Sequence, residues 1–81
     1  MLGFKQLRDK IAEVAGDCVE NEHSDARSGD TVQRTSKGTF VWSKDDRISR
    51  FTDGSRTWID GPHGLQVRGN NERFRWELGL P

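Results

Sequence analysis

The sequence predicts an α+β fold, in which one N-terminal amphipathic helix packs on a small antiparallel β-meander of about five strands. Three observations lead to this prediction: an apolar stripe at helical spacing near the start, closely spaced turn residues after Asp30, and an internal hairpin repeat. The 81 residues are expected to form a single domain, 1–81. Within it, we predict a helical head at 3–21, a polar bridge at 22–30 and a β body at 31–78.

The helical head is predicted from apolar residues that recur three or four positions apart, with charged residues between them. These apolar residues are Phe4, Leu7, Ile11, Val14 and Cys18. Gly16 is a possible helix end, but Cys18 continues the stripe and favours a further turn to about Asn21. The bridge that follows has no periodicity and is predicted to be an exposed connection.

The internal repeat consists of an apolar residue and Gln, a polar stretch with Gly, and then an aromatic-x-Trp segment. Val32-Gln33 precedes Phe40-Val41-Trp42, and Leu65-Gln66 precedes Phe74-Arg75-Trp76, with the two glutamines 33 residues apart. An aromatic-x-aromatic segment places both rings on one face of a strand. Each copy is therefore predicted to be a β-hairpin.

Turn residues divide the β body into short strands. Asp53-Gly54 is the strongest signal, because Asp-Gly supplies the positive φ angles of a type I′ turn and brings Phe51 beside Trp58 across a hairpin. The segment 60–64, Asp-Gly-Pro-His-Gly, predicts a second reversal. It lacks the lysine and the strand-to-helix context of a phosphate-binding loop, so His63 is interpreted as an exposed loop residue.

Charged residues balance overall but are unevenly distributed. Thirteen basic residues match thirteen acidic ones, so the net charge is zero. From Asp9 to Asp30, seven acids and two basic residues give a net charge of −5, which leaves +5 on the rest of the chain. This polarity either steers a charged partner or lets the acidic segment lie in solvent or against the basic part of the fold, and we favour the second interpretation.

Few residues suit catalysis or metal binding. Residues 17–23 gather the Cys18 thiol, the His23 imidazole and three carboxylates, which suggest a thiol nucleophile with its base or, together with His63, a divalent metal site. However, Cys18 lies on the apolar stripe, where a free cysteine usually packs as a small hydrophobe, and a His-x-x-x-His spacing is missing. We therefore expect no enzymatic activity, no metal and no cofactor. A single cysteine also excludes an internal disulfide.

No segment of the sequence has the character of a membrane span or a signal peptide. No apolar run approaches the length of a bilayer crossing, and the Met-Leu-Gly-Phe-Lys start lacks the apolar core of a secretory signal. The chain is expected to be either a cytoplasmic protein or a module of a longer one.

Arginines interleave with aromatic residues along the β body, which is the pattern of single-stranded nucleic-acid binding. The arginines are Arg47, Arg50, Arg56, Arg68, Arg73 and Arg75, and the aromatic residues are Phe51, Trp58, Phe74 and Trp76. A fold this small needs its aromatic side chains in the core, and a zero net charge is unusual for a dedicated nucleic-acid binder. Nucleic acid is therefore an alternative partner and not the preferred one.

Most of the chain resembles a small accessory module found at the C-terminal ends of secreted or cell-surface bacterial proteins. The similar segments are Gly16–His23, Gly29–Thr35, Phe40–Lys44, Phe51–Trp58, Gly61–Gln66 and Arg73–Glu77. The repeat is also similar to the hairpin unit of LGFP-type repeats of bacterial envelope proteins. The resemblance implies an extracellular or cell-surface module that binds an envelope glycan or a partner domain, and it carries over no catalytic residue.

The function predicted from the sequence is non-catalytic binding, in which an exposed Trp ring stacks on a sugar and amide groups bind its hydroxyls. The residues assigned to this site are Trp42, Trp58, Gln33, Gln66 and Arg56. A purely structural unit is a further alternative. It predicts self-association through an apolar helix strip or an edge strand.

Overall fold

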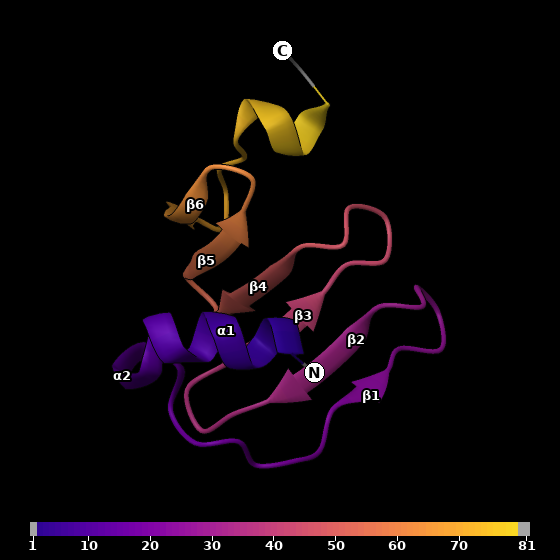
Figure 1. Cartoon of the computed structure of the whole chain (residues 1–81), viewed down its shortest axis with the longest axis vertical. Coiled ribbons are helices and arrows are strands. Elements are labelled where there is room, and N and C mark those ends of the chain that lie inside the picture. Colours follow the sequence, from indigo (N-terminus) through magenta and orange to yellow (C-terminus); the bar gives the residue numbers. More distant parts are fainter. Residues whose placement is uncertain (1, 80–81) are drawn as a thin grey trace.

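The structure, a computed structural model, describes residues 2–79, with side chains from Gly3 onward (Figure 1). Two short helices precede six strands and a final 3-10 helix, so the α+β class is confirmed and the strand count is six rather than five. The elements are α1 (Leu2–Lys10), α2 (Ala12–Ala15), β1 (His23–Ser24), β2 (Thr31–Arg34), β3 (Thr39–Trp42), β4 (Ser49–Thr52), β5 (Arg56–Gly61), β6 (Gly64–Gly69) and η1 (Arg75–Leu78). None of the helices described is long and apolar enough to cross a membrane.

The helical head is shorter than predicted. The backbone leaves helical geometry at Ile11, and α2 ends at Ala15. Gly16 follows with φ 74° and ψ −166°, a conformation that glycine adopts readily and other residues do not. The chain turns there, so Cys18 lies outside the helix in an isolated bridge with Thr35. The predicted continuation to residue 21 is wrong, because the reversal at Gly16 prevails over the apolar stripe.

The polar bridge contains a short strand that the sequence did not predict. β1 pairs antiparallel with β2, with His23 opposite Val32 and Ser24 opposite Thr31. Both β1 side chains are exposed, as expected for a connection on the surface. The pairing has a physical reason, since the outer edge of β2 offers backbone groups that otherwise lack a protein partner.

All six strands form one antiparallel sheet in the order β1-β2-β3-β4-β5-β6, so each strand pairs with its neighbour in sequence. The register places Phe40, Phe51 and Trp58 side by side on one face. Helix α1 packs over this face on β3 and β4, and we call it the helix face (Figure 1). Residues between these, such as Arg50 and Ile59, point to the opposite face, which we call the far face.

The hydrophobic core lies between the helices and the helix face. Its buried members are Phe4, Leu7, Ile11, Ala15, Phe40 and Phe51. Phe40 connects the two layers, because its ring centroid lies 5.3 Å from that of Phe4 and 5.0 Å from that of Phe51. The expected apolar stripe and the expected aromatic face of β3 therefore meet in the core.

The second copy of the repeat is not a hairpin, contrary to the prediction. β6 ends at Gly69, and the segment 74–76 enters the 3-10 helix η1 instead of a returning strand. The N–H of Phe74 donates to Oε1 of Glu77 at 3.2 Å, and Gly79 ends the helix with a φ of 74°. These local caps favour a helical turn, and the Phe74 and Trp76 rings stack with centroids 6.1 Å apart.

The reversals predicted at Asp53-Gly54 and at residues 60–64 are both present. β4 and β5 form a hairpin in which Phe51 lies opposite Trp58, with ring centroids 5.9 Å apart. The turn is not type I′, because Gly54 alone within it has a positive φ, of 98°, whereas that type needs two such residues. The second reversal joins β5 to β6, and His63 is exposed in it.

Candidate functional site

The five residues predicted for a ligand site do not come together. By the register of the sheet, Gln33, Trp42, Trp58 and Arg56 belong to the helix face, whereas Gln66 belongs to the far face. Trp42 and Trp58 are half-buried and pack against the core. The two glutamines of the repeat therefore have unrelated positions.

Gln33 has a local structural role. Its Nε2 donates to the carbonyl oxygen of Glu20 at 3.1 Å and so holds the segment after Gly16 against β2. None of the three Trp side chains is fully exposed, and none is fully buried. Within residues 2–79, each indole is therefore only partly accessible to a sugar, and the predicted stacking on a Trp ring stays a prediction.

Within the acidic segment, Glu20 contacts His23 and Arg34. Oε2 of Glu20 lies 2.6 Å from Nε2 of His23, and Oε1 lies 2.8 Å from Nε of Arg34. The hydrogen bond from Arg34 is the main reason that the pKa of Glu20 lies below its usual value, although partial desolvation opposes it. Cys18 has a different neighbour, Nη1 of Arg8, at 3.8 Å from its Sγ. Among the described residues, no three His, Cys, Asp or Glu side chains are grouped to hold a metal ion.

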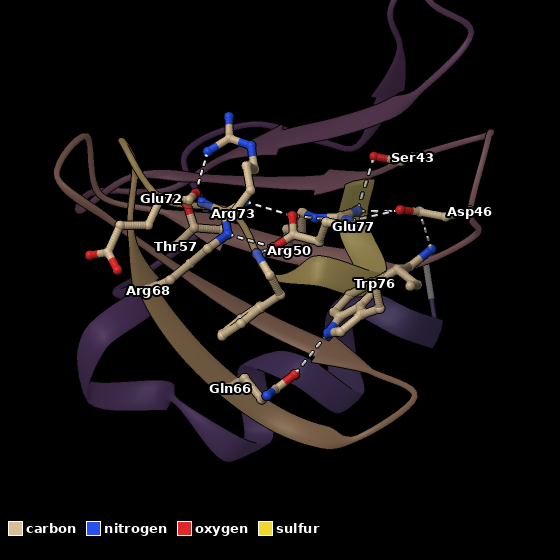
Figure 2. Close-up of polar contacts among 12 residues, drawn as sticks. Ser43, Asp46, Arg50, Thr57, Gln66, Arg68, Glu72, Arg73, Trp76 and Glu77 are labelled. Atoms are coloured by element: carbon tan, nitrogen blue, oxygen red, sulfur yellow. Dashed lines mark hydrogen bonds and ion pairs between the residues drawn. The ribbon is translucent and has the colours of Figure 1, made fainter. Parts of the chain in front are cut away.

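The far face carries a network of ion pairs that connects β4, β6 and η1 (Figure 2). Arg50 contacts Asp46 twice, with Nη1–Oδ1 at 3.2 Å and Nη2–Oδ2 at 2.7 Å. Burial alone would raise the pKa of Asp46, but the Arg50 guanidinium and the N–H of Ile48 outweigh it and lower that pKa. Nη2 of Arg50 also lies 3.6 Å from Oε2 of Glu77.

The pair between Arg68 and Glu77 is the most enclosed part of this network. Nε of Arg68 lies 2.7 Å from Oε1 of Glu77 and Nη2 lies 2.8 Å from Oε2, with each side chain only 6% exposed. Burial raises the pKa of Glu77, but the hydrogen bonds from Arg68 and from the N–H of Phe74 outweigh it, so the pKa lies below its usual value. The Glu77 carboxylate is therefore ionised, and it is held by Arg68 of β6 and by the N–H of Phe74 at the start of η1.

The far face is hollowed beside these ion pairs. A hollow of about 290 Å³ is lined by Val41, Arg50, Thr52, Thr57, Arg68, Asn70 and Arg73. A second hollow of about 460 Å³ shares Arg50, Arg68 and Arg73 with it. Apart from Val41, the smaller hollow is therefore lined by three arginines, two threonines and an asparagine, and no acidic residue lines it.

Hydrogen bonds fix the polar wall of the smaller hollow. Oγ1 of Thr57 donates to Oδ1 of Asn70 at 2.6 Å, and Nδ2 of Asn70 donates to Oγ1 of Thr52 at 3.1 Å. Arg73 uses only Nη1, which donates to the carbonyl oxygens of Asn70 and Glu72 at 2.8 and 2.7 Å. Its Nε and Nη2 therefore have no protein acceptor in the part of the chain that the structure describes.

The side chain of Trp76 covers part of the far face, next to the ion pairs. Its Nε1 donates to Oε1 of Gln66 at 3.3 Å, and the Arg50 guanidinium carbon lies 6.0 Å from the centroid of its ring (Figure 2). The indole lies over Gly61, next to the fully buried side chain of Ile59. The absence of a side chain at residue 61 is what lets the ring lie this close to β5.

Replacing Gly61 with alanine is expected to displace the indole of Trp76. A Cβ at residue 61 would lie 3.0 Å from Cη2 and 3.2 Å from Cζ2 of a rigid ring, so the free energy of unfolding should fall by about 1 to 2 kcal/mol. Urea unfolding measures this loss. In a Trp76→Leu background, the same substitution should cost less, and an equal cost in both backgrounds would contradict the contact.

In the sequence, Arg50, Arg68 and Arg73 indicate nucleic-acid binding only, and their protein partners were not predicted. Glu77 gave no signal of its role, because the residue three positions before it is Phe74 and not the Ser, Thr, Asp or Asn that begins a capping box. Asn70 had no signal apart from its place in a turn. No family model matches the chain, and no curated protein and no solved structure shows a significant match to it. The chemistry of the far face is thus inferred from its geometry.

Proposed function

We propose that this chain is a non-catalytic binding module that acts beside other domains of a secreted or cell-surface bacterial protein, and that its far face binds the acidic sugars of an envelope glycan. The single observation that carries the ligand class is the smaller hollow, which three arginines line and no carboxylate does. Guanidinium groups bind carboxylates through paired, charge-assisted hydrogen bonds. The extracellular setting rests on the resemblance of the sequence to bacterial accessory modules.

The hollow offers the two kinds of contact that an acidic sugar needs. The unused Nε and Nη2 of Arg73 suit the carboxylate, and Thr52, Thr57 and Asn70 suit the ring hydroxyls. Most of this polar surface is held in place by the protein before any ligand binds, because Asn70 bonds to both threonines. Preorganisation of this kind lowers the entropic cost of binding.

The arrangement of the same arginines disfavours nucleic acid as the partner. Arg50 and Arg68 are already paired with Asp46 and Glu77, which reduces the charge available to phosphates. Trp58 packs against the core, and Trp76 packs over Gly61, so these rings are not free to stack on unpaired bases. A sugar acid requires fewer free cations than a phosphate backbone does.

Isothermal titration calorimetry with two matched probes tests the proposal. The first is a galacturonic acid oligosaccharide and the second is its fully methyl-esterified form, which keeps the sugar rings and removes the charge. We expect the acid form to bind more tightly, and Arg73→Ala to weaken its binding on the order of tenfold, because one charge-assisted contact is lost. Since Arg73 contacts only backbone oxygens at the surface, the variant should keep the fold.

Arg27→Ala is the matched control, because Arg27 is exposed in the connection between β1 and β2 and should not affect binding. Equal binding of the acid and the ester, or no binding of either at millimolar concentration, would overturn the proposal. Tighter binding of an oligothymidylate than of the acid sugar, with a steep dependence on salt, would overturn it in favour of nucleic acid.

A further inference from the structure

The sheet has two edges of very different character. At one edge, β1 is two residues long, carries only exposed polar side chains and is flanked by Glu22 and Asp25. At the other edge, β6 runs for six residues, and in the sheet it has a neighbour, β5, on one side only (Figure 1). Short and charged edge strands resist pairing with other chains, whereas β6 has no proline and no lysine.

Alternate residues of β6 direct their backbone N–H and carbonyl groups away from β5, out of the sheet. The N–H of Asn70 donates inward to the carbonyl oxygen of Ser55 at 2.9 Å, and the carbonyl oxygen of Gly69 accepts from Glu72 on the outer side at 3.1 Å. Backbone groups alternate in direction along an antiparallel strand, so those of Leu65 and Val67 point outward as Gly69 does. Both residues thus offer a donor and an acceptor to an added strand.

The same two residues are among the most exposed large apolar side chains of the described part. Leu65 is 41% exposed and Val67 is 52% exposed, both on the helix face, with the half-buried Trp58 directly opposite Val67. The only charged residue of β6 is Arg68, which points to the far face and is neutralised by Glu77. The edge is therefore apolar at Leu65 and Val67 on the helix face, where the nearest carboxylate is that of Glu72 beside Gly69, and its far-face charge is compensated.

We propose that β6 is a self-association surface, on which a second copy of this chain adds its own β6 in antiparallel orientation. In the symmetric register, Leu65 of each copy lies opposite Val67 of the other, and the Gln66 residues face each other. No like charges meet, since Arg68 lies opposite Gly64. Four exposed apolar side chains then form one stripe that is continuous with both Trp58 rings.

A symmetric β6-to-β6 contact fits this edge better than a β6-to-β1 contact does. β1 offers only two residues for a ladder, and a contact between two different edges would build an open chain of molecules instead of a closed pair. The symmetric pair covers only one strand edge and its apolar stripe, an area below that of a standard interface. The dimer is therefore weak, with a dissociation constant on the order of tens to hundreds of micromolar.

Sedimentation velocity of the whole chain tests this proposal. The concentrations run from about 10 μM to about 1 mM, a range that spans the expected dissociation constant. The wild type should shift from monomer towards dimer, and Val67→Lys should remain monomeric because it introduces two like charges into the stripe. Val19→Lys is the matched control, since Val19 is an apolar residue 61% exposed away from β6, and this variant should dimerise as the wild type does.

Backbone amide exchange separates strand pairing from other contacts. The amides of Leu65 and Val67 should exchange more slowly in the concentrated sample than in the dilute one. A wild type that stays monomeric at 1 mM overturns the proposal, as does a dimer that persists in the folded Val67→Lys variant. Neither readout involves a sugar, so failure here and failure of the proposed glycan binding are distinguishable.

Discussion

Replacing Phe40 with alanine is expected to destabilise the fold by about 3 to 5 kcal/mol, because it leaves a cavity in the core. Phe40 is fully buried, and its ring packs between Phe4 of α1 and Phe51 of β4. The substitution thus removes contacts within the sheet and between sheet and helix. A domain of this size has a free energy of unfolding of about 4 to 12 kcal/mol, so this loss is a large part of the total.

Urea unfolding followed by circular dichroism measures this loss. Phe40→Leu is the matched control, because it keeps most of the apolar volume, and it should cost less than half as much. Phe74→Ala removes the same side chain from a half-buried position outside the core cluster and should also cost less. An equal loss for Phe40→Ala and Phe74→Ala would contradict the assignment of the core to the helix face.

Replacing Glu77 with alanine is expected to cost about 3 to 5 kcal/mol, because it leaves the Arg68 guanidinium buried without a counterion. Both side chains of the pair are 6% exposed. The same substitution removes the acceptor of the Phe74 N–H and so weakens the start of η1. By contrast, replacing both members with apolar residues, as in Arg68→Met with Glu77→Leu, should cost much less than the single substitution.

Two measurements check the role of Glu77. A double-mutant cycle of Arg68 and Glu77, measured by urea unfolding, should give a large coupling energy. An exposed surface ion pair typically gives only about 0 to 1 kcal/mol. The second measurement is the pH dependence of unfolding. Because the pKa of Glu77 is lowered in the folded state from a reference value of 4.5, its contribution is fully present above that value and is lost as the pH falls through the folded pKa.

Below pH 4.5, therefore, the wild type should lose stability faster than Glu77→Gln does. Asp53 and Glu20 also have lowered pKa values, share no partner with Glu77 and are retained in both proteins, so their effects cancel in the comparison. Asp46 shares Arg50 with Glu77, so its titration belongs to the same ion-pair network. Parallel pH profiles for the two proteins, or a coupling energy near zero, would show that the ion pair contributes little to the fold.

Features set by periodicity and local turns could be predicted from the sequence. The stripe of Phe4, Leu7 and Ile11 forms the buried helix face, because the spacing of a helix leaves no other way to cover these side chains. The hairpin of Phe51 and Trp58 follows from the glycine at residue 54. In both cases, the residues that decide the structure lie within a few positions of each other.

Features that depend on distant partners could not be predicted. β1 exists because the edge of β2 accepts it, and nothing in the residues His23 and Ser24 favours a strand. The resemblance between Gln33 and Gln66 suggested equivalent hairpins, but the contact of Glu77 with Arg68 draws the second copy across the far face. The candidate binding hollow results from that crossing, so its residues gave no pattern in the sequence.

The pairing of every strand with its sequence neighbour also has a kinetic consequence. Hairpins of this kind form from segments close together in the chain, which keeps the loop-closure cost low and favours rapid folding. The late step is then the docking of α1 on β3 and β4, because these strands are its main contacts and lie about thirty to fifty residues further along the chain. Sheet assembly can thus precede helix docking, with Phe40 briefly exposed between the two events.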